Sequence, residues 1–177
     1  METSQTLSSD MPAGFTLRQD LKPGDLGSIV HLHGTIYARE YGFDPTFEAY
    51  VAGPMSEFVC SRTDRERLWI VEREGRIVGC IAIVCASASE AQLRWFLVDP
   101  SARGMGLGKK LLNEAVEFSR RADYESIFLR TVSALTAAAR LYRSVGFEKV
   151  EQQPRRLWGV EVVEEKYVLK FRSTLAS

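Results

Sequence analysis

Three glycines at alternate positions, in the stretch "RGMGLGKK", are the residues of this sequence that most directly suggest chemistry. Gly104, Gly106 and Gly108 allow the backbone to turn tightly and allow a ligand to approach without meeting Cβ atoms. A helical pattern follows at once, so the loop would present free N–H groups beside the positive end of a helix dipole. The stretch therefore predicts an anion site that suits a phosphate or pyrophosphate.

Two lysines open the helix that follows this loop. Lys109 and Lys110 stand in its first turn, where the dipole disfavours each exposed cation by about 0.3–1 kcal/mol. A bound anion would remove this conflict, because the dipole and the lysines would then attract it together. Arg103, just upstream, supports the same interpretation. The alternative is a glycine-rich turn that binds nothing.

Two well-known phosphate loops do not fit the stretch. The Walker A pattern requires glycine where Arg103 stands and Ser or Thr where Lys110 stands. The Rossmann fingerprint requires glycine where Lys109 stands, and its acidic residue after the second strand is not evident. What remains is Arg-x-x-Gly-x-Gly after a strand that ends in "LVDP". The failure of both standard loops argues against a nucleotide-phosphate enzyme.

The elements that must position this loop can be predicted from hydrophobic periodicity and turn residues. A strand over 91–99, a helix over 109–122 and a strand over 126–132 imply a parallel crossover within a mixed sheet. A second helix follows, with Ser133 as its N-cap and Gly146 as its stop. The segments "EKVEQQPRRLWG" and "EEKYVLKF" form a last strand pair.

The N-terminal half of the chain predicts a strand, two helices and a hairpin. The strand covers 15–19, and the first helix ends at Gly42. The second helix has Asp44 as N-cap and Pro45 as its first residue, with a kink or break at Gly53-Pro54. The hairpin lies within 67–87 and turns at Glu74-Gly75. This order places the fold in the α/β or α+β group.

Composition and charge narrow the classes of function. The chain has 177 residues, enough for one domain with a sizeable core. Lys+Arg and Asp+Glu both number 23, and the resulting zero net charge argues against a dedicated nucleic-acid binder. The three cysteines have no metal-ligand spacing and only two histidines are present, so no metal site is expected.

No segment of the sequence predicts a membrane span or a signal peptide. The longest apolar run, 77–88, is too short to cross a bilayer, and the N-terminal residues lack a basic region and an apolar region. A cytoplasmic location is therefore expected. Residues 1–14 and 171–177 are expected to be tails around a single domain over 15–170.

Two motifs, in the right order, resemble the GNAT superfamily of GCN5-related N-acetyltransferases. The stretch "FLVDPSARGMGLGKKLL" is similar to the family pattern of a strand ending V-x-P followed by R-G-x-G-x-G, and "AARLYRSVGFEKV" is similar to A-x-x-L-Y-x-x-x-G-F. The C-terminal half also resembles the acetyltransferase module of MarR-type fusion regulators. The resemblance implies a mixed, mostly antiparallel sheet of about seven strands flanked by about four helices.

The resemblance further implies acetyl-CoA as cofactor. The loop Arg103 to Gly108 would hold the pyrophosphate through backbone amides, and the strand end at Phe96 to Val98 would pair with the pantetheine arm. A backbone N–H there would polarise the thioester carbonyl. The implied cofactor positions are Phe96, Leu97, Val98, Arg103, Gly104, Met105, Gly106, Leu107, Gly108, Lys109, Ser133 and Ala138.

Tyr142 matches the family's tyrosine that protonates the departing CoA thiolate. The alternative is that it belongs to the apolar stripe of its helix.

Two positions depart from the family pattern. Leu135 replaces a common asparagine, whose pantetheine contact could pass to Thr131 or Ser133, and Arg130 replaces the glutamate base of enzymes that acetylate protein N-termini. Arg130 is then either a contact for a substrate carboxylate or an ordinary salt-bridged arginine.

The resemblance places the acceptor site among the first two helices and the last strand pair. Its candidate residues are His33, Tyr37, Glu40, Tyr41, Glu90, Trp95, Arg130 and Trp158. Glu40, Glu90, His33 or a water chain could serve as general base, and the residues leave that choice open. An equally good interpretation makes Tyr37 and Tyr41 core residues and Glu40 a surface residue.

The leading hypothesis is an N-acetyltransferase that acts on a primary amine of a small molecule or a lysine side chain. The alternative is a non-catalytic acyl-CoA-binding regulatory module, which the missing asparagine and glutamate would fit. By analogy with the family, the last strand pair could join two chains as a homodimer.

Overall fold

The computed structural model describes residues 11–171. Residues 1–10 and 172–177, which belong to the expected tails, lie outside the described part. Its elements are β1 (Phe15–Arg18), α1 (Asp25–Tyr41), α2 (Thr46–Ser61), β2 (Arg67–Arg73), β3 (Arg76–Cys85), β4 (Glu90–Val98), the short 3-10 helix η2 (Pro100–Ala102), α3 (Leu107–Arg121), β5 (Ser126–Val132), α4 (Thr136–Ser144), β6 (Glu148–Leu157) and β7 (Val160–Lys170).

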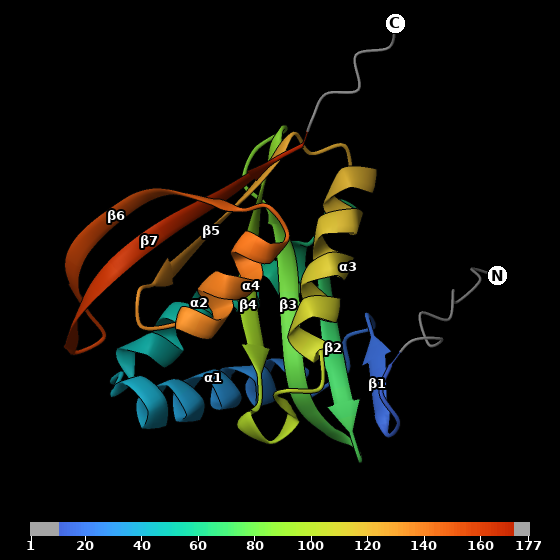
Figure 1. Ribbon diagram of the computed structural model, residues 1–177. Helices are drawn as coiled ribbons and strands as arrows, with labels where there is room; N and C mark the ends of the chain where they lie inside the picture. The colour runs from blue at the N-terminus through green and yellow to red at the C-terminus, as the bar shows by residue number, and fades with distance from the viewer. Residues whose placement is uncertain (1–10, 172–177) are drawn as a thin grey trace, which may run out of the picture.

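The strands of the described residues form one 7-stranded sheet in the order β1-β2-β3-β4-β5-β7-β6 (Figure 1). Every neighbouring pair is antiparallel except β4 with β5, which are parallel and joined through α3. This confirms the predicted mixed, mostly antiparallel sheet and its single parallel crossover. The number of strands and α-helices also agrees with the prediction.

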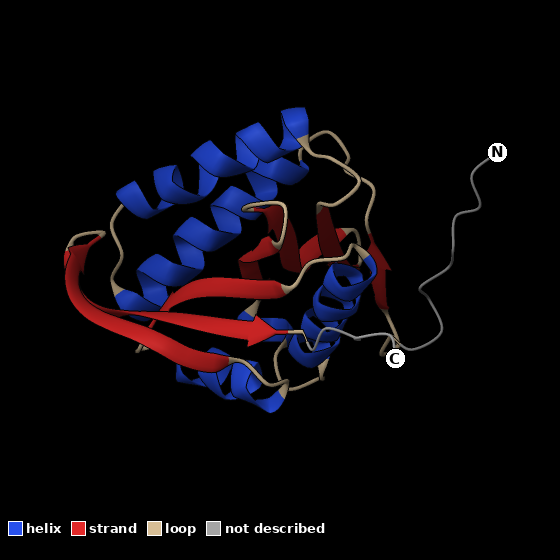
Figure 2. Cartoon of the chain, turned by 90° about the horizontal axis from the view of Figure 1, so that it is seen from above, coloured by secondary structure: helices blue, strands red, loops and turns tan. Residues whose placement is uncertain are grey.

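Helices lie on both sides of the sheet (Figure 2), and each side has its own hydrophobic core. On one side the fully buried Leu111 and Leu112 of α3 pack against strands. On the other side Ile29 of α1 and Met55 of α2 are equally buried. The two halves of the molecule are therefore held to opposite faces of the same strands by apolar contact.

The pairing of β4 with β5 ends early. Only Glu90, Ala91 and Gln92 pair with residues of β5, although β4 continues to Val98 and β5 to Val132. Beyond Gln92 the edge of β4 that faces β5 therefore has no strand partner among the described residues. Unpaired backbone groups at such an edge can bind another extended chain.

A bulge in β4 changes which side chains face this gap. Trp95 has a positive φ of 49°, and the register with β3 shifts between Cys80 and Ala82. In an unbroken strand Leu93 and Trp95 would face the same side, but they belong to the two different cores. The thiol of Cys80 donates a hydrogen bond of 3.0 Å to the Trp95 carbonyl and so supports the bulge.

Several predicted helix ends are correct, and others move by a few residues. Gly42 caps α1 with φ 72°, as predicted. The helix α3 begins at Leu107 rather than Lys109, because Gly106 with φ 77° is its N-cap. Ser133 is not the N-cap of α4, because its N–H donates to Val163 in β7; the helix instead begins after Leu135.

The second helix also differs from its prediction. Asp44 accepts a hydrogen bond of 2.9 Å from the Thr46 N–H, but Pro45 rather than Asp44 is the N-cap. Pro54 lies inside α2 without breaking it, because Val51 and Met55 on either side are buried against the sheet. The predicted hairpin turn at Glu74-Gly75 is confirmed by the positive φ of both residues. The last strand begins at Val160, earlier than predicted.

Candidate active site

Two cavities open where β4 and β5 separate. The larger one, which we call the loop cleft, has a volume of about 610 Å³ and is bounded by the glycine loop, the end of β4 and the start of α4. The smaller one, the aromatic cavity, has a volume of about 100 Å³ and lies between β4, β5, the first two helices and the turn from β6 to β7. The cavities meet at Tyr37, Phe96 and Leu135, which line both.

The three glycines of the loop have different structural roles. Gly104 and Gly106 have φ values of 78° and 77° and open space around them, so they are needed for the path of the backbone. A Cβ at Gly108 would lie 3.2 Å from Leu141 of α4. Gly108 therefore allows α3 and α4 to approach closely, and all three glycines line the loop cleft.

Arg103 is tied to α1 rather than left to point into solvent. Its guanidinium forms a two-pronged ion pair with Glu40, at 2.8 and 3.2 Å, and its Nε donates to the Val98 carbonyl at 3.0 Å. Glu40 and Tyr41, which the sequence assigned to the acceptor site, therefore lie in the loop cleft. Glu40 and burial together raise the pKa of Tyr41, burial contributing most.

The start of α4 contributes a wall that the sequence analysis largely missed. Thr136, Ala137 and Ala138 line the loop cleft at the helix N-terminus, and Arg140 and Ser144 lie further along. Of the predicted cofactor positions, Met105 and Ser133 do not line the cleft. The alanine run in "TAAAR" could have indicated this wall, because small residues allow a ligand to approach a helix end closely.

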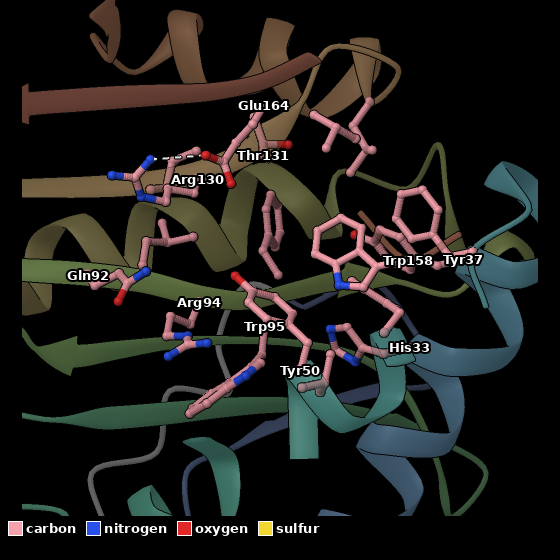
Figure 3. Close-up of a pocket in the computed structure, with 18 of the residues that line it drawn as sticks. His33, Tyr37, Tyr50, Gln92, Arg94, Trp95, Arg130, Thr131, Trp158 and Glu164 are labelled. Atoms are coloured by element: carbon pink, nitrogen blue, oxygen red, sulfur yellow. Dashed lines mark hydrogen bonds and ion pairs between the residues drawn. The ribbon is translucent and has the colours of Figure 1, made fainter. Parts of the chain in front are cut away.

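The aromatic cavity is closed by a cluster of rings. The turn between β6 and β7 docks on the first two helices, where the Trp158 carbonyl accepts a hydrogen bond of 2.9 Å from the Asp44 N–H. The Trp158 ring lies 4.8 Å from Phe43, 4.9 Å from Phe47 and 5.2 Å from Tyr50, measured between ring centroids. Trp158, Tyr37 and Trp95 therefore line one cavity although they come from distant parts of the chain (Figure 3).

His33 faces this cavity as a neutral ring. Its Nδ1 lies 2.8 Å from the Ile29 carbonyl, so we assign the proton to Nδ1, because a carbonyl oxygen can only accept. Burial lowers the pKa of His33 to about 4, with the Ile29 hydrogen bond acting in the opposite sense. At neutral pH the imidazole is uncharged, and Tyr37 stacks beside it at 6.0 Å.

Tyr142 is buried beside the junction of the two cavities. Phe96, Phe147 and Tyr167 surround its ring at centroid distances of 6.0, 5.9 and 5.8 Å. Burial raises its pKa well above the usual value, so the phenol keeps its proton. Within residues 11–171 its hydroxyl has no hydrogen-bond partner, and the residue lines the aromatic cavity.

Charged residues gather at the side of the cavity opposite His33 and Trp158 (Figure 3). Arg130 forms an ion pair with Glu164 at 3.3 Å. This agrees with the interpretation of Arg130 as an ordinary salt-bridged arginine. Arg94 lines the cavity nearby and was not singled out by the sequence analysis. Glu90, a base candidate, lines neither cavity and contacts Ser126 at 3.5 Å.

The chain resembles known proteins both in sequence and in fold. Residues 64–149 match the acetyltransferase (GNAT) domain. An uncharacterized N-acetyltransferase of Schizosaccharomyces pombe is 31% identical over 121 residues, which are 65% of this chain and 72% of the relative. One from Escherichia coli is 38% identical over 88 residues, 47% of this chain and 52% of that protein.

Among solved structures, a Salmonella typhimurium protein with its cofactor acetyl-CoA has a TM-score of 0.71 at 18% identity, over 92% of this chain and 97% of that one. The sheet of this chain splits between its two parallel strands, and the glycine loop lies on one side of the split. The chain belongs to the GNAT acetyltransferases. No helix in the described part of the chain is long and apolar enough to cross a membrane.

Proposed function

We propose that this protein transfers an acetyl group from acetyl-CoA to a primary amine, of a small molecule or a lysine side chain, by direct attack of the amine. The observation that carries the proposal is the meeting of two cavities at Phe96, with Tyr142 beside the junction. A cofactor arm in one cavity and an acceptor in the other would bring the reacting atoms together there.

The residues of the loop cleft fit acetyl-CoA. The N–H groups of the glycine loop and the N-terminus of α3 favour a pyrophosphate. The cations Arg103, Lys109 and Arg140 line the same cleft. The unpaired edge of β4, at Phe96 to Val98, can pair with the amide groups of a pantetheine arm as an added strand. When bound, acetyl-CoA supplies a thioester carbonyl for the amine to attack.

Tyr142 has the chemistry of a proton donor for the departing thiolate. Its buried phenol is neutral across the physiological range, and its hydroxyl is not committed to a described protein group. A donor positioned in this way contributes typically a factor of about 10²–10⁴ to a rate. The proposal therefore assigns protonation of the CoA sulfur to Tyr142.

Of the three side chains considered as general base, only His33 lines the aromatic cavity, where the proposal places the acceptor. Glu40 is held by Arg103 in the loop cleft, and Glu90 lines neither cavity. The neutral His33 ring has Nε2 available to accept a hydrogen bond from an amine. Because its pKa is as low as about 4, the His33 ring is too weak a base to take the proton itself. We therefore assign His33 the role of orienting the amine by a hydrogen bond, and a water chain the removal of the proton.

Calorimetry with acetyl-CoA, followed by an assay of CoA release over a panel of amines, tests the proposal. We expect binding and release with at least one amine. Binding without release from any amine would support the non-catalytic module instead, and absence of binding would overturn both. The cytoplasmic location and the homodimer stay predictions from the sequence.

A further inference from the structure

Arg94 lines the aromatic cavity without an acidic partner among the described residues. The other cation that lines the cavity, Arg130, is paired with Glu164 at 3.3 Å, and the nearby Lys166 of β7 is paired with Glu151 at 3.7 Å. Glu164 is also shared with Arg155 at 3.9 Å. The one carboxylate that lines the cavity, that of Glu164, is therefore already ion-paired with other arginines. The charge of Arg94 is not compensated, so the cavity carries a net positive charge on this side.

Aromatic rings hold the Arg94 side chain in place. Its guanidinium carbon lies 5.7 Å from the centre of the Tyr50 ring and 5.3 Å from that of Trp95. These contacts use the faces of the rings, and the guanidinium N–H groups have no hydrogen-bond acceptor among the described residues. Arg94 is partly buried, so the charge acts in a less polar medium than water.

A carboxylate is the group that matches this arrangement. A guanidinium presents a rigid fork of donors that binds both oxygens of a carboxylate at once. An amine that lacks an anion would enter the cavity as a second positive charge beside Arg94. Across the cavity, Trp158 and the other rings offer an apolar wall, as Figure 3 shows for the labelled residues.

We propose that the acceptor is a small amine that also bears a carboxylate, an amino acid with an apolar side chain, and that Arg94 binds the carboxylate. This inference rests on the proposed function and names the substrate class of the same site. A lysine within a protein chain has no free carboxylate next to its amine, so it would leave Arg94 without an anionic partner in the cavity.

Matched pairs of acceptors test this proposal. Alanine with ethylamine, leucine with isopentylamine, and phenylalanine with phenethylamine differ within each pair by the carboxylate alone. We expect at least one amino acid to have a kcat/KM at least about tenfold above that of its partner, since a hydrogen-bonded charge pair is worth about that much. O-phosphoethanolamine with ethanolamine tests a phosphate as the source of the charge.

In Arg94→Gln we expect the preference within the favoured pair to fall by about tenfold or more, and in Arg94→Lys by less. Arg76→Gln is the matched control, because Arg76 is exposed in β3 and lines neither cavity. The acetyl-CoA affinity of Arg94→Gln reports whether the variant is folded, because Arg94 does not line the loop cleft.

The outcomes separate this inference from the proposed function. If acetyl-CoA binds but no amine of the whole panel releases CoA, the proposed function fails. If other amines of the panel react but no acceptor of these pairs does, only the inference fails. If amines without a carboxylate react as well as the amino acids, the enzyme stands and the inference about Arg94 is overturned. An Arg94-dependent preference for O-phosphoethanolamine alone would overturn the assignment of a carboxylate.

Discussion

The two cavities of this protein meet at one strand but are built by different means. The loop cleft is formed largely by backbone: glycines with positive φ, two helix N-termini, and the unpaired edge of β4. The aromatic cavity is formed by side chains, with single rings and charges drawn from both N-terminal helices, β4, β5 and the β6–β7 turn.

This difference explains why the loop cleft shows as a local pattern in the sequence, whereas the residues of the aromatic cavity were named only through the family resemblance. A backbone site needs residues that permit its conformation, so Gly104 and Gly106 stand at fixed spacing within one short stretch. A side-chain site needs only that several elements converge. Each of its residues, such as Tyr37 or Trp158, looks by itself like an ordinary core residue.

The largest effect we expect comes from the junction between the cavities. Tyr142→Phe removes the hydroxyl and keeps the ring, so turnover should fall by about a hundredfold or more while acetyl-CoA affinity stays the same. Steady-state kinetics and calorimetry measure the two quantities. Tyr124→Phe is the control, because Tyr124 is also buried but donates its hydroxyl to the Arg65 carbonyl at 2.9 Å, outside both cavities. Unchanged turnover in Tyr142→Phe would remove its assigned role.

The next largest effect concerns the ionisation of His33. Burial lowers its pKa from 6.5 to about 4, so below about pH 6.5 the unfolded chain takes up a proton that the folded protein takes up only near pH 4. Stability should therefore fall as pH drops through this window, by about 2–3 kcal/mol in the free energy of unfolding. Denaturant titrations at pH 7 and pH 4.5 measure the change.

The matched variants for this prediction lie on the same helix. His33→Gln removes the titrating group and keeps a donor for the Ile29 carbonyl, so the fall in stability between pH 7 and pH 4.5 should become smaller. His31→Gln, at an exposed position, should leave the fall as it is in the parent protein. Equal pH dependence in all three proteins would show that His33 is not held neutral by burial.

The fold itself was predictable for reasons that the particular residues make clear. Periodicity located α3 and β5. Turn residues located the end of α1 at Gly42 and the turn between β2 and β3 at Glu74-Gly75. The Trp95 bulge was not predictable, because a tryptophan in a strand gives no sign of a positive φ. Without the bulge, the alternation of β4 gives no reason to place Arg94 and Trp95 in the same cavity.

In the site, too, local patterns predicted some features, and others depended on how distant elements pack together. The sequence considered a carboxylate contact at Arg130, but β7 supplies Glu164 as its partner, and only the register of β5 with β7 reveals this. Likewise, Glu40 was grouped with the acceptor because of its position in α1. Its pairing with Arg103 depends on how α1 lies across the glycine loop, which no local pattern encodes.

A smaller effect is expected for the backbone of the loop cleft. Gly106→Val forces a branched side chain into φ 77° at a cost of about 1–3 kcal/mol, so the loop should rearrange and acetyl-CoA affinity should fall by about tenfold. Gly75→Val is the control, since Gly75 has φ 74°, equally open surroundings and a place in a distant hairpin. An equal loss of affinity in both variants would point to general destabilisation rather than to the loop.

The smallest effect tests whether the loop cleft depends on side chains at all. Glu40→Gln removes the negative charge beside Arg103, which keeps its hydrogen bond to the Val98 carbonyl and becomes a stronger attractor for an anion. Because both side chains are partly exposed, we expect the acetyl-CoA Kd to fall by only about two- to fivefold at low salt. The difference should disappear at about 1 M salt, where screening is strong.

Glu117→Gln is the control for Glu40, since Glu117 forms an exposed ion pair with Arg120 outside both cavities. Calorimetry at the two salt concentrations separates charge from positioning. If the Kd rises in Glu40→Gln and salt does not change the difference, then Glu40 acts by holding Arg103 in place. The loop cleft would then rely on converging side chains as the aromatic cavity does, and the contrast between the two would be one of degree.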